Sequence, residues 1–187
     1  MRLFALIALS GMAAASVARA DLVNNGGFET GDLTGWSAAG DFTYTGVNAS
    51  PNIHSGNFAF DMGPVNGEGS ISQNLSTVAG QTYQFSFWLA NDGGIPNNFH
   101  ALWNGAEQLG LTDANGFGYT QYSYNVTATG ASTTIEFDFY QLPAWYHLDD
   151  VSVTSAVPLP PAAAMGIGGM AGIGMIGAIR RRRTIRG

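Results

Sequence analysis

Alternating apolar and polar side chains mark the middle of the chain as a series of short β-strands. The pattern is clearest over residues 82–90, and residues 133–140 repeat it. A period of two residues predicts a strand with one buried and one solvent-facing side. The positions predicted to face the core are Tyr83, Phe85, Phe87 and Leu89 in the first range and Ile135, Phe137 and Phe139 in the second. Trp88 falls on the polar side of its strand.

Turn-forming clusters rich in Gly and Asn divide the remaining body into further short strands, and no apolar stripe with helical spacing persists. The dipeptide Asn104-Gly105, a strong hairpin signal, separates two of them. The other predicted strands are 21–29, 41–46, 57–62, 69–76, 99–103, 107–111, 119–127 and 147–154. This many short strands in one domain-sized segment predict an all-β fold, a single antiparallel β-sandwich of jelly-roll type.

The two ends of the chain depart from the strand pattern. Residues 1–20 combine a charged start, a short apolar stretch and small residues before Asp21, which predicts a secretory signal peptide; a buried N-terminal helix is the alternative. Residues 162–179 are uncharged and apolar, and as a helix they would span roughly 27 Å, close to the thickness of a membrane core. A transmembrane helix is therefore expected there, with a disordered tail as the alternative.

The C-terminal segment 157–187 resembles a known sorting signal. It begins with Val157, Pro158, Leu159 and Pro160, continues with the apolar run, and closes with Arg180, Arg181, Arg182 and Arg183. This order resembles the PEP-CTERM sorting tail in its VPLPA variant, although Pro161 precedes the usual alanine. The resemblance implies a Gram-negative exported protein, anchored in the inner membrane until an exosortase-type processing protease releases it to the cell surface or extracellular matrix. The arginines would stay on the cytoplasmic side.

The charge distribution narrows the partners of the predicted domain, residues 21–156. The chain has seven basic and thirteen acidic residues, and every basic residue is an arginine that lies in one of the two end segments. The domain therefore has no cation to offer to phosphate groups, which excludes nucleic acid binding, and an anionic polysaccharide would be repelled. The absence of cysteine excludes disulfides and thiolate metal sites.

Four short blocks of the domain resemble the galactose-binding-like jelly roll of carbohydrate-binding modules. They are residues 22–31, 35–36, 54–59 and 148–153. The resemblance implies a structural Ca²⁺ held by Glu29 and Asp149, with Asp150 as the alternative aspartate. Calcium would relieve the repulsion between carboxylates that no lysine or arginine neutralises. The alternative is that these are solvated carboxylates at strand ends.

The sequence favours a non-catalytic protein that binds a neutral extracellular polysaccharide. Sugars stack on aromatic rings and exchange hydrogen bonds with Asn, Gln and Asp, and the domain is rich in both kinds of side chain. The candidate stacking residues are Trp88, Trp145, Trp103, Tyr119 and Tyr140, whereas Trp36 is expected in the core. A calcium-stabilised structural protein without a sugar ligand is the alternative.

Enzymatic activity is the weaker interpretation. A glycoside hydrolase needs two carboxylates across a sugar-sized cleft, and an acidic sandwich always offers such pairs. The three histidines, His54, His100 and His147, lie far apart without the spacing of a zinc motif, so each is interpreted as a surface or strand-face residue.

Overall fold

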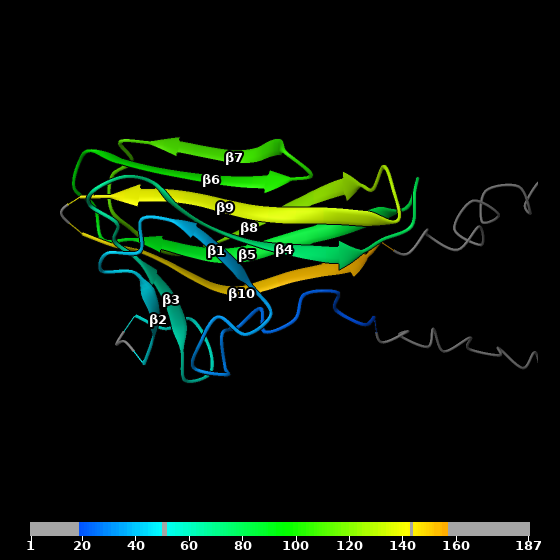
Figure 1. The fold of residues 1–187 in the computed structure, drawn as a ribbon, viewed down its shortest axis with the longest axis horizontal. Coiled ribbons are helices and arrows are strands. Elements are labelled where there is room, and N and C mark those ends of the chain that lie inside the picture. The colour runs from blue at the N-terminus through cyan, green and yellow to red at the C-terminus, as the bar shows by residue number, and fades with distance from the viewer. Residues whose placement is uncertain (1–18, 50–51, 143, 157–187) are drawn as a thin grey trace, which may run out of the picture. The chain divides into compact units, whose positions relative to one another are not determined.

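The structure is a computed structural model that describes residues 19–49, 52–142 and 144–156 (Figure 1). Most of the predicted signal peptide and the whole predicted sorting tail lie outside these residues. Within the described ranges, no helix is long and apolar enough to cross a membrane.

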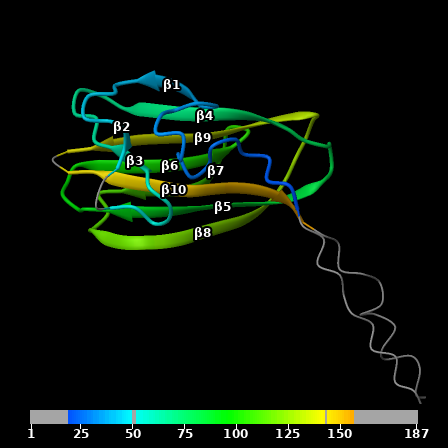
Figure 2. The ribbon, with the colours of Figure 1, turned by 90° about the horizontal axis from the view of Figure 1, so that it is seen from below.

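Ten strands form two five-stranded sheets in which every neighbouring pair is antiparallel. The first sheet has the order β1-β4-β9-β6-β7, with bounds Ser37–Gly40, Gly69–Ser76, Ser132–Gln141, Asn97–Trp103 and Ala106–Thr112. The second has the order β2-β3-β10-β5-β8, with bounds Gly46–Asn48, Ala59–Met62, Tyr146–Ser155, Thr82–Asn91 and Phe117–Thr127. Figure 2 shows the two sheets as facing layers. The predicted antiparallel sandwich is confirmed.

An aromatic core fills the space between the sheets. Phe137 on β9 is fully buried, and its ring lies 5.1 Å from that of Phe87 and 5.9 Å from those of Phe85 and Phe99, measured between ring centroids. These contacts join the central strands of both sheets. The inward positions predicted for residues 82–90 and 133–140 are all buried, and so is Trp36. The alternation thus identified the core side of both strands correctly.

Several predicted boundaries agree closely with the structure. The range 69–76 coincides with β4, and the Asn104-Gly105 turn joins β6 to β7. Both turn residues have positive φ angles, 50° and 78°, as a two-residue hairpin turn requires.

Two predictions at the start of the domain are wrong. Residues 21–29 are not a strand, because Asn25 and Phe28 adopt positive φ angles and the chain turns back through a hydrogen bond from the Phe28 N–H to the Asn25 carbonyl. Residues 41–45 also form a turn, and β2 begins only at Gly46. The strand β1 was not predicted, since all its residues are exposed and lack the apolar alternation.

Candidate functional site

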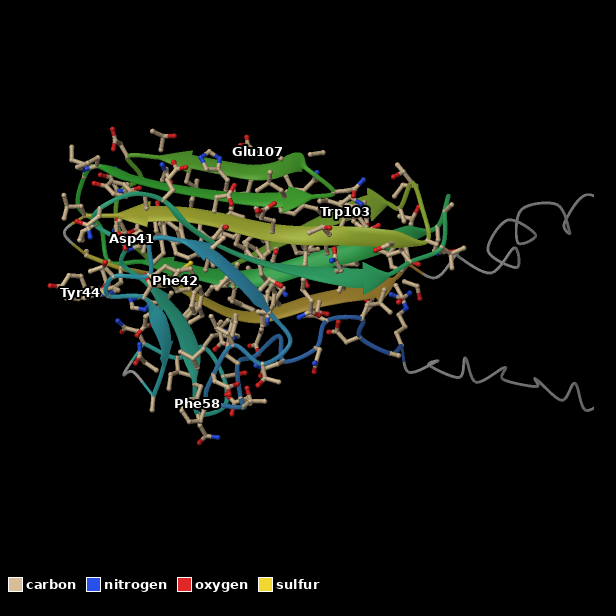
Figure 3. The ribbon with its side chains drawn as sticks, in the orientation of Figure 1. Asp41, Phe42, Tyr44, Phe58, Trp103 and Glu107 are labelled. Carbon is tan, nitrogen blue, oxygen red and sulfur yellow. The ribbon has the colours of Figure 1, made fainter. Side chains whose placement is uncertain are left out.

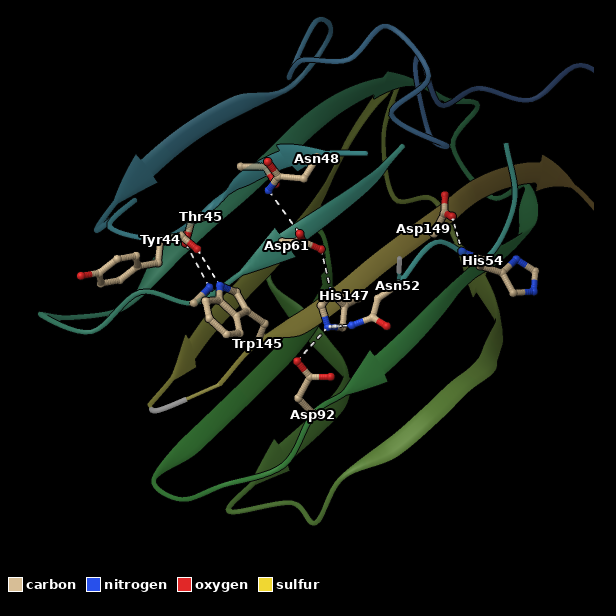
Figure 4. Close-up of polar contacts among 12 residues, drawn as sticks. Tyr44, Thr45, Asn48, Asn52, His54, Asp61, Asp92, Trp145, His147 and Asp149 are labelled. Carbon is tan, nitrogen blue, oxygen red and sulfur yellow. Dashed lines mark hydrogen bonds and ion pairs between the residues drawn. The ribbon is translucent and has the colours of Figure 1, made fainter. Parts of the chain in front are cut away.

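Two pockets open on the outer face of the second sheet. The first, called here the tryptophan pocket, has a volume of about 390 Å³ and is lined by Tyr44, Thr45, Gly46, Asn48, Asp61 and Trp145. The second, the histidine pocket, has a volume of about 590 Å³ and is lined by Asn52, Ile53, Ala90, Asn91, Asp92, Gly116, Phe117, Gly118, Tyr119 and His147. The Asp61 side chain in one pocket bonds to the His147 ring in the other, so the two pockets are neighbours (Figure 4).

Trp145 presents an exposed indole that is nevertheless held in place. Its side chain is 39% exposed, and its Nε1–H donates a hydrogen bond to the Tyr44 carbonyl at 3.0 Å. The ring also lies against Gly63, where an added Cβ would come within 2.5 Å of the indole nitrogen. A glycine is therefore needed at position 63 for the ring to occupy this place.

Tyr44 stands at the rim of the same pocket, at the tip of the turn that follows β1, and is 68% exposed (Figure 3). Asp41 organises this turn. Its carboxylate accepts hydrogen bonds from the Thr43 hydroxyl and N–H and from the N–H groups of Val65 and Asn66, and these bonds lower the pKa of Asp41 to about 2. The turn is thereby fastened to the loop that precedes β4.

His147 separates the two pockets and is bound on both sides by carboxylates (Figure 4). Its Nδ1 lies 2.6 Å from Asp61 Oδ1, and its Nε2 lies 3.1 Å from both Asp92 Oδ2 and Asn52 Nδ2. Asp61 in turn accepts a hydrogen bond from the Asn48 side chain. The ring is almost fully buried, whereas the Asp92 side chain is 39% exposed toward solvent. Burial lowers the pKa of His147, but the hydrogen bonds and charges of Asp61 and then Asp92 outweigh it, so the pKa is raised overall.

This raised pKa predicts a loss of stability at alkaline pH. A cation with a folded-state pKa above its unfolded value adds its stabilisation fully below the unfolded pKa, and the contribution disappears as the pH rises through the folded pKa. We therefore expect the Tm to fall as the pH rises above about 6.5, the ordinary pKa of histidine. In a His147→Gln variant this dependence should be reduced, as thermal denaturation monitored by circular dichroism can show.

The control is His100→Gln, which removes a histidine paired with Glu107 on the exposed side of the other sheet. Exposed pairs contribute little to stability. An unchanged pH dependence in His147→Gln, or an equal change in His100→Gln, would contradict the assignment to His147.

The rest of the histidine pocket is aromatic and polar. Tyr119 donates its hydroxyl hydrogen to the Asn52 carbonyl at 3.0 Å, which fastens β8 to the segment 52–58. Burial raises the pKa of Tyr119, and the negative charges of Asp149, Asp61 and Asp150 raise it further. The pocket therefore lies in a negative electrostatic potential.

Below this pocket, a network of buried amides orders the loops at the same end of the sandwich. The Asn97 side chain donates to the carbonyls of Gly94 and Ala114 and accepts from the Tyr146 hydroxyl. The Asn91 side chain accepts a hydrogen bond from the buried Gln141 side chain. Because buried polar groups that are paired rigidify their surroundings, this network holds the loops that carry Asp92 and Phe117.

The predicted calcium ligands are gathered around one short segment, residues 54–58. Asp149 is fully buried and accepts the N–H groups of His54 and Ser55 on one oxygen and that of Asp150 on the other. Burial raises the pKa of the Asp149 carboxyl, although the N–H bonds oppose this effect. Asp150 binds the His54 ring at 2.6 Å and the Ser55 hydroxyl at 2.8 Å.

Glu29 binds the far end of this segment. Its carboxylate accepts the N–H groups of Asn57 and Phe58, and these bonds lower its pKa. A Cβ built on Gly56 would lie 2.2 Å from a Glu29 oxygen, so this close approach requires the glycine.

A local distortion of β10 accompanies the clustering of Asp149 and Asp150. The pairing of β10 with β5 shifts between Asp149 and Ser152, and Asp150 has a φ angle of 47°. A Cβ added to Gly27 would lie 3.4 Å from Asp150 Oδ1, 3.8 Å from Asp149 Oδ1 and 3.7 Å from Glu29 Cγ. The carboxylates of Asp149 and Asp150 and the Cγ of Glu29 therefore lie near Gly27, whereas the carboxylate oxygens of Glu29 lie beside Gly56. In the described part of the chain, His54, Asp149 and Asp150 are also the group whose ligand atoms lie within 4.8 Å of one another.

The five predicted stacking residues lie in different environments. Trp145 and Tyr119 line the pockets. Trp88 is half-buried and stacks on His54, with ring centroids 3.8 Å apart, so one of its faces is covered. Tyr140 lies on the opposite sheet. Trp103 is not available for stacking, because it is buried against Tyr83 and Phe85 and its indole N–H bonds to the Thr127 carbonyl.

Sequence reasoning missed the polar centre of the site. His147 was interpreted as a surface or strand-face residue, yet it is buried, and Asp61 and Asp92 were not selected. Asp61 and His147 each interrupt an otherwise apolar stretch, Phe58-Ala-Phe-Asp-Met62 and Trp145-Tyr-His-Leu148. Two ionisable residues of opposite type, each inside an apolar strand, are a usable signal of a buried pair, because a buried charge requires a partner.

Comparison with solved structures agrees with this architecture, whereas no curated protein matches the chain. TmCBM61, solved in complex with β-1,4-galactotriose, is 19% identical with a TM-score of 0.62, over 73% of this chain and 99% of that chain. The CBM22-1 xylan-binding domain from Paenibacillus barcinonensis Xyn10C is 18% identical with a TM-score of 0.54, over 78% and 100%. The K1 cleaved adhesin domain of Lys-gingipain from Porphyromonas gingivalis W83 is 12% identical with a TM-score of 0.55, over 70% and 96%.

At such identities these similarities show the fold alone. The family assignment rests on the sequence itself, since residues 20–154 match the family described as carbohydrate binding domain, CBM_4_9. This match covers nearly the whole sandwich, including both pockets and the predicted calcium ligands. The chain belongs to this family of carbohydrate-binding modules.

Proposed function

We propose that this protein is an exported, non-catalytic module that binds a neutral extracellular polysaccharide in the tryptophan and histidine pockets. Membership of a carbohydrate-binding family supports the ligand class. The composition of the pockets supports their assignment as the binding site, because they combine exposed aromatic rings with amide and carboxylate groups that can exchange hydrogen bonds with hydroxyls.

The observation that carries this proposal is the fixed, exposed indole of Trp145. Its hydrogen bond to Tyr44 and its contact with Gly63 orient the ring before any ligand arrives. A preorganised ring costs less ordering entropy on binding than a mobile one. The neighbouring Asp61 and Asn48 can then bond the hydroxyls of a sugar stacked on the ring.

Replacing Trp145 with alanine is expected to weaken glycan binding about tenfold or more, because a central aromatic side chain supplies a large part of such binding energies. The full-length chain is first screened on a glycan array, and the affinity of the best uncharged glycan is then measured by isothermal titration calorimetry. Equal thermal stability of the variant and the native protein confirms that folding is intact.

The matched control is Tyr140→Ala, which removes an aromatic side chain from the outer face of the opposite sheet and is expected to leave the affinity unchanged. A loss of binding in Tyr140→Ala but not in Trp145→Ala would place the site on that sheet instead. Absence of any glycan signal would overturn the binding function and favour a structural role for the domain.

We also propose that Ca²⁺ binds beside Gly27. The donor set fits, because the Asp149 and Asp150 carboxylates supply hard oxygen ligands close to one another and residues 21–156 contain no lysine or arginine to neutralise them. The absence of a side chain at Gly27 leaves space beside these two carboxylates, and Glu29, whose Cγ lies nearby, is the third proposed ligand. Bound calcium would supply countercharge and fasten the segment 54–58 to β10 and to Glu29.

The terminal segments complete the proposal. We propose that residues 1–20 direct export and that residues 157–187 serve as a PEP-CTERM-type tail, which holds the protein in the inner membrane of a Gram-negative bacterium until an exosortase-type protease acts. The order of the proline motif, the apolar run and the arginine cluster supports this part of the proposal.

A further inference from the structure

The two pockets contain acidic groups that an uncharged sugar would leave without a countercharge. Asp92 lines the histidine pocket with its side chain 39% exposed, and Asp61 lines the tryptophan pocket. His147 lies between them and carries at most one positive charge. Two carboxylates against one imidazolium leave a negative balance at the centre of the site.

No lysine or arginine elsewhere in the domain offsets this excess of negative charge. Residues 21–156 contain no lysine or arginine, so beyond His147 no such cationic side chain of the domain can reach the pockets. A site lined by charge of one sign concentrates ligands of the opposite sign.

The aromatic groups at the site favour the same kind of ligand. Tyr44 and Trp145 expose their rings beside Asp61, and Phe117 and Tyr119 line the pocket that contains Asp92. An ammonium group is attracted both by the faces of aromatic rings and by a carboxylate. A sugar that carries an ammonium group can thus stack its ring on an aromatic side chain while its ammonium group binds the nearby carboxylate.

We propose that the two pockets select polysaccharides with free amino groups, that is, amino sugars without an N-acetyl substituent. Asp92 is the residue that recognises the ammonium group, because it is the more exposed carboxylate and its oxygens can accept hydrogen bonds beyond the one from His147. This inference rests on the proposed carbohydrate-binding function but replaces its neutral ligand with one that is cationic at mildly acidic pH.

The test compares three β-1,4-linked hexasaccharides that differ only in the group at C2. They are cellohexaose with a hydroxyl, chitohexaose with an N-acetyl group, and the glucosamine hexamer with an amine. Binding of each to the full-length chain is measured by isothermal titration calorimetry at pH 6 in low salt. We expect the glucosamine hexamer to bind roughly tenfold more tightly than cellohexaose, with most of this advantage lost in 0.5 M salt because exposed charges are screened.

Two variants separate local recognition from the general negative charge of the domain. Asp92→Asn should abolish the preference, so that the glucosamine hexamer binds no more tightly than cellohexaose. Glu107→Gln removes the same charge from β7 on the other sheet, where Figure 3 shows Glu107, and should keep the preference. Equal loss in both variants would overturn the role of Asp92.

The outcomes distinguish this inference from the proposed function. If the three hexasaccharides bind equally, or chitohexaose binds best, the selection for amino groups is wrong but carbohydrate binding stands. If none of the three binds, and no glycan on the array does, both are wrong. If calcium chloride displaces the glucosamine hexamer at a concentration where equal ionic strength of sodium chloride does not, the carboxylates bind a divalent cation rather than a sugar ammonium, and the inference is overturned.

Discussion

Replacing Asp149 with alanine is expected to lower the free energy of unfolding by roughly 3 kcal/mol, because three N–H groups lose their acceptor and a buried donor without a partner costs about 1 to 3 kcal/mol. The three donors belong to His54, Ser55 and Asp150. Urea denaturation followed by tryptophan fluorescence measures the change. A loss of this size is a large fraction of the stability of an ordinary domain.

The same variant tests the calcium site. In the native protein, removal of Ca²⁺ by a chelator should lower the Tm, since a ligand that binds only the folded state stabilises it. In Asp149→Ala the chelator should have little further effect. An unchanged Tm of the native protein in chelator would overturn the calcium proposal, whereas the loss of stability in the variant would still stand on the hydrogen bonds alone.

Asp138→Ala is the matched control for this experiment. Asp138 is also an aspartate within a strand, but it lies on β9 with Glu136 nearby, and its pKa is raised by burial and by that charge. Removing it relieves repulsion, so we expect stability to stay the same or to rise. If Asp138→Ala destabilises the protein as much as Asp149→Ala, the loss of any strand carboxylate has this effect. The assignment of the effect to the hydrogen bonds between Asp149 and the segment 54–58 would then be wrong.

Replacing Phe137 with alanine is expected to lower the free energy of unfolding by about 3–5 kcal/mol. The ring is fully buried and contacts Trp36, Phe85, Phe87 and Phe99, so its removal leaves a cavity between the two sheets. Urea denaturation again gives the change, and a Phe137→Leu variant should recover more than half of the loss because it fills most of the cavity.

Phe58→Ala provides the control for the loss of a phenyl ring as such. Phe58 precedes β3 and is only half-buried, with its ring over Gly31 at the periphery of the second sheet (Figure 3). We expect less than half of the effect of Phe137→Ala. Equal effects would show that the centre of the sandwich does not depend on Phe137 more than on a peripheral ring.

The parts of the fold that the sequence predicts are those in which hydrophobic periodicity governs the backbone. β4, β5 and β9 each have one side in the core, so the alternation of residues reports their position directly. In the first residues of the domain, hydrophobic periodicity does not determine the backbone conformation. Phe28 is buried, as an apolar residue on the core side of a strand would be. Its φ angle of 56°, however, places it in a turn rather than a strand. Side-chain burial alone does not distinguish these two conformations.

The candidate site was likewise predicted only in part. Resemblance to carbohydrate-binding modules indicated Glu29, Asp149 and Asp150 as calcium ligands, and this remains a prediction; the structure places Asp149 and Asp150 together with His54. The pairing of His147 with Asp61 was not predicted, because the two residues are 86 positions apart and meet only through the pairing of β10 with β3. Nor does composition reveal that Trp103 is buried while Trp145 is exposed; Trp103 lies at the end of β6, whereas Trp145 lies in the loop before β10.

The strand β10 runs from the tryptophan pocket toward the opposite end of the sandwich. This strand begins at Tyr146, next to Trp145, and ends at Ser155, so that roughly 30 Å of extended chain separates the tryptophan pocket from the point where the described chain ends (Figure 1). Leu22 bonds to the Val153 carbonyl, so the chain also enters the domain near that far end. Both the first and the last described residues of the domain therefore lie toward the end of the sandwich remote from the tryptophan pocket, so the proposed sugar site and the two chain ends occupy opposite ends of the same strand.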